Sequence, residues 1–193
     1  MYKNCATEAS AARQRQLEQG LLMAMTKRCY DEITVSDLCA EIGVPRKSFY
    51  RYFSGKEGAL HALIDHTIQT FEMQYVPTVI SQGQSVQQGI SCFFQFWRQQ
   101  KMLLDALNHS GLSGVLIERI INYSVAGQFS SDHILQQVHK KLRTEAVMFA
   151  VCGLMSMVLR WHQDGYRADP DSIAELAAAL LTQPLFSDTI MKQ

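Results

Sequence analysis

Residues 43–57, GVPRKSFYRYFSGKE, decide the interpretation of this sequence, because they combine four cationic side chains with four aromatic rings. Their only acidic residue is Glu57, at the end. Three interpretations compete: a phosphate-binding loop, a solvated basic surface, and a helix that enters a DNA groove. The first fails, since a P-loop needs G-x-x-x-x-G-K-[ST] after a strand. Here a helical segment precedes Gly55, and Glu57 follows Lys56.

The residues around the turn at Gly43 predict a helix-turn-helix. Thr34 is a good N-cap for a short helix, and Gly43 ends that helix because glycine adopts positive φ without steric cost. Pro45 is expected at the first position of a second helix. Phe49 and Phe53 are four residues apart, so both rings face inward on that helix.

The outward positions of the second helix carry polar and cationic side chains. Arginine and lysine donate to the O6 and N7 acceptors of guanine, and tyrosine hydroxyls donate to phosphate oxygens. A charge run alone is usually a solvated surface, but its position on a helix-turn-helix favours DNA. The outward set comprises Arg46, Lys47, Ser48, Tyr50 and Arg51, with Tyr52 also expected to face the duplex.

The remainder of the chain predicts helices and no sheet, because no stretch alternates apolar and polar residues. The first helix is expected over about residues 8–29, and Ser54 with Glu57 suggests a capping box for a helix reaching about Tyr75. Three apolar-rich helical segments follow. Residues 146–159 predict a helix that is buried on several sides and too short for a bilayer. Asp169 and Pro170 begin the last helix.

Composition excludes several classes of protein. The 193 residues carry 18 Lys and Arg and 18 Asp and Glu, so bulk attraction to nucleic acid or anionic lipid is not expected. Five cysteines without a C-x-x-C pair fit reduced thiols in the cytoplasm. We expect no signal sequence, no membrane association, no metal, no cofactor and no catalytic constellation. The protein is therefore expected to be no enzyme.

Residues 33–60, ITVSDLCAEIGVPRKSFYRYFSGKEGAL, resemble the DNA-binding domain of the TetR family of bacterial transcriptional regulators. The resemblance covers about residues 10–65 and includes the threonine before the second helix, the Gly-Val turn and the aromatic end of the third helix. It implies contacts with the bases of a double-stranded operator for Ser36, Arg46, Lys47, Ser48 and Arg51. It implies phosphate contacts for Thr34, Tyr50, Tyr52 and Lys56.

The resemblance also implies a domain organisation: a DNA-binding domain over residues 1–55 and a helical effector-binding and dimerisation domain over 56–193. A small-molecule effector is expected among the middle helices, although an aromatic stretch there is more often ordinary core. The expected pocket residues are Phe93, Phe94, Trp97, Met102 and Tyr123.

The last two helices are implied to form a four-helix bundle with a second copy of the chain. Their composition agrees, because an all-round apolar helix lies beside one whose alanines permit close packing; these are Ala174, Ala177, Ala178 and Ala179. The alternative is that both helices belong to the core of a single chain.

The sequence thus predicts an all-α, homodimeric transcriptional regulator, expected to be a repressor released from a near-palindromic operator by its effector. The alternative is a TetR-like helical interaction protein that acts as a co-regulator and binds no specific DNA sequence itself.

Overall fold

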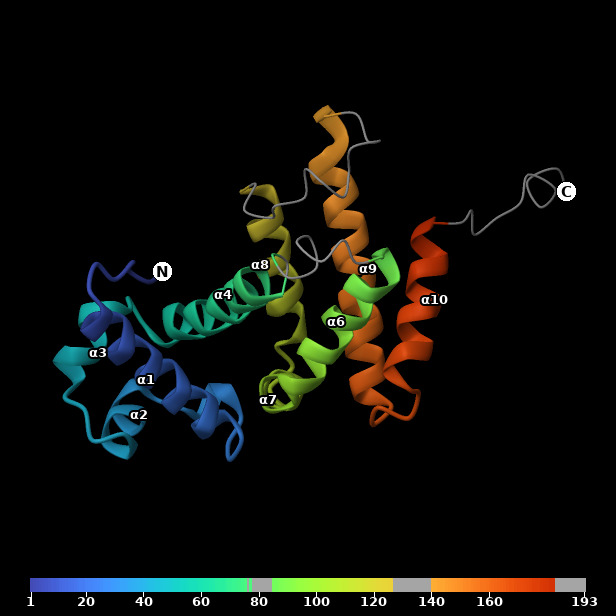
Figure 1. Ribbon diagram of the computed structural model, residues 1–193. Helices are drawn as coiled ribbons and strands as arrows, with labels where there is room; N and C mark the ends of the chain where they lie inside the picture. Colours follow the sequence, from blue (N-terminus) through green and yellow to red (C-terminus); the bar gives the residue numbers. More distant parts are fainter. Residues whose placement is uncertain (76, 78–84, 127–139, 183–193) are drawn as a thin grey trace, which may run out of the picture. The chain divides into compact units, whose positions relative to one another are not determined.

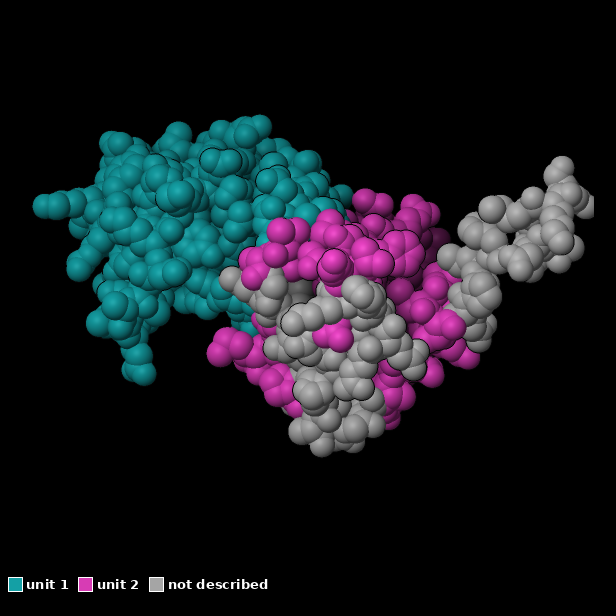
Figure 2. Space-filling model, turned by 90° about the horizontal axis from the view of Figure 1, so that it is seen from above, with its two compact units in different colours: residues 1–70, 101–123 teal, residues 71–100, 124–193 magenta. Residues whose placement is uncertain are grey.

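The computed structural model describes residues 1–75, 77, 85–126 and 140–182 of the chain (Figure 1). The regular elements among these residues are helices, which confirms the all-α fold class. They divide into two compact units, residues 1–70 with 101–123 and residues 71–100 with 124–193 (Figure 2). The functional division expected between residues 55 and 56 lies inside the first unit and stays a prediction.

The first unit contains the predicted helix-turn-helix together with longer helices. It comprises α1 (Glu8–Met25), the 3₁₀ turn η1 (Tyr30–Glu32), α2 (Val35–Glu41), α3 (Arg46–Tyr52), most of α4 (Lys56–Gln74), α7 (Lys101–His109) and most of α8 (Ser113–Val125). The second unit contains α6 (Val86–Gln99), η2 (Lys140–Leu142), α9 (Arg143–Gln163) and α10 (Pro170–Thr182).

Helix α1 ends at Met25, four residues before the expected end at Cys29. The hydroxyl of Thr26 donates to the Met23 carbonyl, and the Lys27 amide donates to the Ala24 carbonyl, so the last turn tightens. Cys29 is then the N-cap of η1 and does not extend the apolar stripe of α1. The tightened turn lets the chain leave the helix axis before α2 begins.

The turn between α2 and α3 has the predicted chemistry. Thr34 caps α2, accepting from the Asp37 amide at 3.1 Å and donating to the Asp37 carboxylate at 2.6 Å. Gly43 has φ of 66°, a conformation that side chains with a Cβ rarely adopt. Pro45 is the N-cap of α3 and not its first residue, one position from the prediction.

Helix α4 begins at Lys56, so the capping box expected between Ser54 and Glu57 is wrong. Ser54 lies two positions before the first helical residue. Its hydroxyl donates to the Met1 carbonyl at 2.9 Å and so serves a contact with the amino-terminal arm, residues 1–3.

In the second unit, α10 packs along α6. Ala174 and Ala177 are 0% and 1% exposed, so their small side chains permit close approach within the chain. The expectation that these two alanines contact a second subunit is therefore wrong. Ala178 and Ala179 are half-buried.

Helix α9 departs from the prediction in both length and burial. With 21 residues and a mean hydropathy of 1.3, α9 is long and apolar enough to cross a membrane. No other helix in the described part of the chain meets both conditions. Only 17% of the most apolar 18-residue stretch of this helix is buried. It is thus neither too short for a bilayer nor buried on several sides within one chain.

The contact between α1 and α2 generates a stability prediction. A Cβ placed on Gly20 would lie 2.6 Å from Cγ2 of Ile42, whose branched side chain is stiff. We expect Gly20→Ala to lower the free energy of unfolding by about 1 kcal/mol, because the overlap outweighs the gain in helix propensity. Urea denaturation followed by circular dichroism measures it.

Gly114→Ala is the matched control, since a Cβ there meets no atom within 4 Å. This change in α8 should raise the free energy of unfolding by a few tenths to about 1 kcal/mol. Equal effects of the two substitutions would contradict the close packing of α1 on Ile42.

Candidate nucleic-acid interface

Helix α3 has one buried aromatic side and one exposed cationic side. Phe49 and Phe53 are 0% and 2% exposed, and their ring centroids lie 5.1 Å apart. Burial of both rings fixes the rotation of α3 about its axis. The side chains left in contact with solvent are Arg46, Lys47, Tyr50 and Arg51, with Ser48 half-buried.

Tyr52 lies on the buried side, with 7% of its surface exposed. The expectation that it projects outward with Tyr50 is wrong, because Tyr52 follows Phe49 by three residues and shares its side of the helix. Its ring packs 6.3 Å from that of Phe53. Its predicted phosphate contact is not tested by the structure.

The amino-terminal end of α2 presents Thr34 and Ser36, which are both exposed. The hydroxyl hydrogen of Thr34 is already donated to Asp37, and this bond is the main cause that holds the pKa of Asp37 below its usual value. Ser36 lies in the first turn of α2 and adds a short polar side chain that can donate to or accept from a base edge. Contact with DNA remains a prediction for both residues.

Lys56 has partners that the sequence did not indicate. Its ammonium donates to the backbone carbonyls of Tyr30 and Ile33, the latter at 2.7 Å, and lies 3.5 Å from the Asp31 carbonyl. It also lies 4.1 Å from the centroid of the Tyr30 ring, within range of a cation–π interaction. Burial lowers the pKa of Lys56.

These contacts make Lys56 a clamp between the start of α4 and the turn that precedes α2. An ammonium has three donors, and three carbonyls of residues 30–33 accept from this one. The predicted phosphate contact of Lys56 is not tested by the structure. The pKa of Tyr30 is raised to about 12, mainly by burial of its ring and also by the negative charges of Glu57 and Asp31.

The arm, residues 1–3, lies against the carboxyl end of α3 (Figure 1). The Lys3 amide donates to the Tyr52 carbonyl at 3.0 Å, and the Ser54 amide donates to the Met1 carbonyl at 3.1 Å. Tyr2 and Phe53 thereby form an antiparallel bridge. The sequence did not indicate this role, because no local pattern in a three-residue segment predicts its pairing with residues about fifty positions away.

The expected effector residues divide between the two units. In the second unit, α6 contributes Phe93, Phe94 and Trp97, all at most 8% exposed. The first unit contains Met102, which is 41% exposed and so departs from a buried pocket residue, and Tyr123, which is 9% exposed.

The two tryptophans of the second unit differ in hydrogen bonding. Trp161 Nε1 donates to the Ala168 carbonyl at 2.9 Å. In the described structure, the buried Nε1 of Trp97 has no hydrogen-bond partner. Its ring packs against Phe96 and Phe93, with centroids 5.5 and 6.3 Å away.

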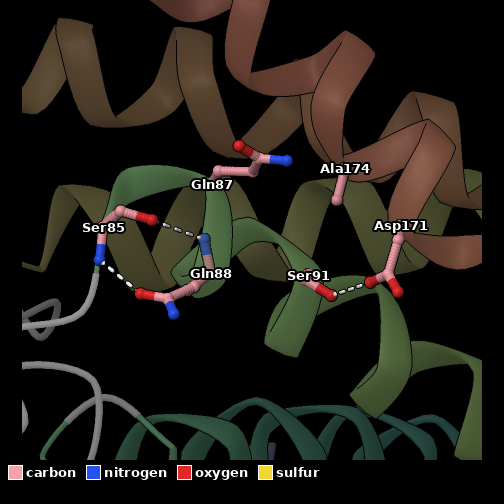
Figure 3. Close-up of a pocket in the computed structure, with 6 residues that line it drawn as sticks. All are labelled: Ser85, Gln87, Gln88, Ser91, Asp171 and Ala174. Atoms are coloured by element: carbon pink, nitrogen blue, oxygen red, sulfur yellow. Dashed lines mark hydrogen bonds between the residues drawn. The ribbon is translucent and has the colours of Figure 1, made fainter.

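A separate pocket of about 530 Å³ lies between α6 and α10 (Figure 3). Two pairs of its polar side chains bond to each other: Ser85 and Gln88 form the capping box of α6, and Ser91 donates to Asp171 at 2.7 Å. The expected aromatic residues do not line it. The full lining is Ser85, Gln87, Gln88, Ser91, Asp171 and Ala174.

Among known protein families, residues 21–63 match the one described as bacterial regulatory proteins, tetR family. No curated protein sequence matches the chain. Among solved structures, the fatty acid degradation regulator FadR from Bacillus halodurans superposes with a TM-score of 0.57 at 16% identity, covering 95% of this chain and 98% of FadR. The dihydroxyacetone kinase operon activator DhaS superposes with a TM-score of 0.59 at 11% identity, covering 88% and 93%. At identities this low, the two superpositions show a shared fold and no more than that.

The clamp at Lys56 generates a prediction about stability. Lys56→Met retains much of the side-chain length but removes the donor from several carbonyls, so we expect the free energy of unfolding to fall by about 1–2 kcal/mol. Lys47→Met is the control, because Lys47 is exposed on α3, and it should change stability by less than about 0.5 kcal/mol. Urea denaturation measures both variants. Equal stability of the two would show that the carbonyl contacts of Lys56 contribute nothing.

Proposed function

By its amino-terminal domain the chain belongs to the TetR family of bacterial regulatory proteins, and from that premise we propose that it is a homodimeric, effector-responsive repressor of transcription. It acts in the cytoplasm, where each subunit of the dimer inserts α3 into the major groove of one operator half-site. Two half-sites with a centre-to-centre distance of about 34 Å would place the grooves on one side of the duplex.

The observation that supports this function best is the exposed cationic side of a helix whose opposite side is buried. Arg46, Lys47 and Arg51 project from α3, while Phe49 is completely inaccessible to solvent. Arginine offers paired donors that match O6 and N7 of guanine. A net charge of zero means that affinity for DNA must come from this local surface and not from the whole chain.

Arg46 is expected to read a base. Arg46→Ala should weaken binding to the operator by about 5- to 150-fold, the equivalent of about 1–3 kcal/mol, and relax preference at one position of each half-site. Selection from random DNA by wild type and variant, followed by affinity measurement at fixed salt, tests this.

Lys27→Ala is the matched control, because Lys27 is an exposed cation outside α2 and α3. It should leave the selected sequence unchanged. If wild-type protein enriches no palindrome, the chain is instead the co-regulator that binds no specific DNA sequence.

We propose that the exposed side of α9 packs against a second copy of the chain. Phe149 is 72% exposed, and Gly153, Ser156 and Arg160 are exposed at successive intervals of three or four residues, so they share one side of the helix. A Cβ on Gly153 would meet no atom within 4 Å, which leaves room for another helix. Leu176 of α10 is a further exposed apolar residue of the second unit, with 54% of its surface accessible.

Phe149→Asp should weaken the dimer at least tenfold, because a carboxylate would be buried against apolar side chains of the partner. Sedimentation velocity over a concentration series measures the change. Val86→Asp is the control, since Val86 is also a half-exposed apolar residue but begins α6. A wild-type protein that sediments as a monomer, or that fractionates with membranes, would contradict a dimer formed through α9.

The effector is proposed to bind near the aromatic residues of α6. The ring of Phe71, near the end of α4, lies 5.4 Å from that of Phe93 and 5.2 Å from that of Phe96. Trp97 adds a buried N–H without a partner among the described residues. These features favour an apolar effector with a hydrogen-bond acceptor. Such a molecule releases DNA only by binding the released conformation more tightly than the DNA-bound one.

A further inference from the structure

A buried carboxylate joins three parts of the first unit. Asp65 of α4 is 4% exposed. The hydroxyl of Tyr2 donates to its Oδ2 at 2.7 Å, and Arg119 of α8 donates from Nε to its Oδ1 at 2.8 Å and from a terminal nitrogen to Oδ2. An ionised carboxylate is stable at this depth only when such partners compensate for lost water. Asp65 therefore depends on both Tyr2 and Arg119.

Tyr2 belongs to the arm that pairs with the carboxyl end of α3. Its neighbours Met1 and Lys3 hold the backbone hydrogen bonds to Ser54 and Tyr52. The arm passes so close to α4 that a Cβ on Gly58 would overlap the Met1 carbonyl oxygen. Any force that moves the Tyr2 side chain is thus transmitted to the last residues of α3.

The neighbouring residue of α4 provides a second link, to α1. His66 Nδ1 lies 2.9 Å from both carboxylate oxygens of Glu18, which is 1% exposed. The Tyr2 ring packs edge-on against the His66 ring, with centroids 5.7 Å apart. Asp65 and His66 consequently connect the arm, α1 and α8 through one turn of α4.

We propose that Arg119 is a positioning residue for DNA binding: acting through Asp65 and Tyr2, it holds the arm against the end of α3 and so sets the orientation of that helix. This inference rests on the proposed function, because it concerns the control of operator affinity. It makes α8 an element through which conformational change reaches α3. A shift of α8 that separates Arg119 from Asp65 would release the arm and lower affinity without touching a DNA-contacting side chain.

Burial and the bond to Asp65 raise the pKa of Tyr2, in that order of importance. The hydroxyl accordingly remains a donor throughout the range in which the protein would bind DNA. The bond to Asp65 similarly raises the pKa of Arg119, so the fork of donors stays charged.

Tyr2→Phe and Arg119→Gln test the proposal with two readouts. The first is hydrogen exchange of the Lys3 and Ser54 amides, measured by nuclear magnetic resonance without DNA. Both variants should exchange these amides at least about fivefold faster than wild type, since the arm loses its anchor. The second is affinity for the selected operator, which should fall about three- to tenfold in each variant.

The double variant should bind operator no more weakly than the weaker single variant, because both substitutions break one chain of contacts. Arg119→Lys should fall between wild type and Arg119→Gln, since lysine keeps the charge but loses the paired donors. Lys101→Gln is the control. It removes an exposed ion pair with Asp105, at 2.6 Å on α7, and should change neither readout.

Unchanged amide exchange in Tyr2→Phe would overturn the proposal, as would wild-type operator affinity in that variant, which keeps the aromatic ring. Should Arg119→Gln fail to fold, Tyr2→Phe alone decides. Failure of wild-type protein to select any DNA sequence would refute the proposed function and with it the claim about operator affinity. The exchange experiment would still decide whether Arg119 holds the arm.

Discussion

Burial of Phe49 and Phe53 beneath α3 is the contact on which the rest of the interface depends. A helix of seven residues is too short to be stable in water by itself, so its shape and rotation come from what it packs against. With both rings buried, the side chains of Arg46, Lys47, Tyr50 and Arg51 are exposed. Packing thus stabilises a short helix and holds its hydrogen-bond donors on one exposed side.

Two further contacts hold the segments that flank the helix-turn-helix. Lys56 fastens the start of α4 to the carbonyls of residues 30–33, before α2. The arm fastens the end of α3 through the Tyr52 carbonyl and Ser54 amide. Neither contact involves a side chain that we expect to read bases. Orientation and recognition are therefore carried by different residues, and a regulatory signal can change the first without altering the second.

Local chemistry explains why the helix-turn-helix was predictable from sequence. The cap at Thr34, the positive φ at Gly43 and the inward pair of phenylalanines each follow from a few adjacent residues. Contacts between distant segments were not predictable in this way. The carbonyls bound by Lys56 lie 23 to 26 residues upstream, and Arg119 is 54 residues from Asp65.

The prediction that the alanines of α10 contact a second subunit failed for a similar physical reason. Alanines on α10 indicate that another helix approaches closely, but composition does not identify that helix. The structure assigns Ala174 and Ala177 to α6 of the same chain, which leaves the exposed side of α9 as the surface that we propose for a second copy.

If α3 reads the major groove of two half-sites, it should shield guanine N7 from methylation on operator-length DNA. N7 lies in the major groove, so we expect two protected clusters about one helical turn apart, both lost in a variant that lacks Arg46, Lys47 and Arg51. Protection confined to the minor groove, or a bound complex that leaves every N7 reactive, would contradict it.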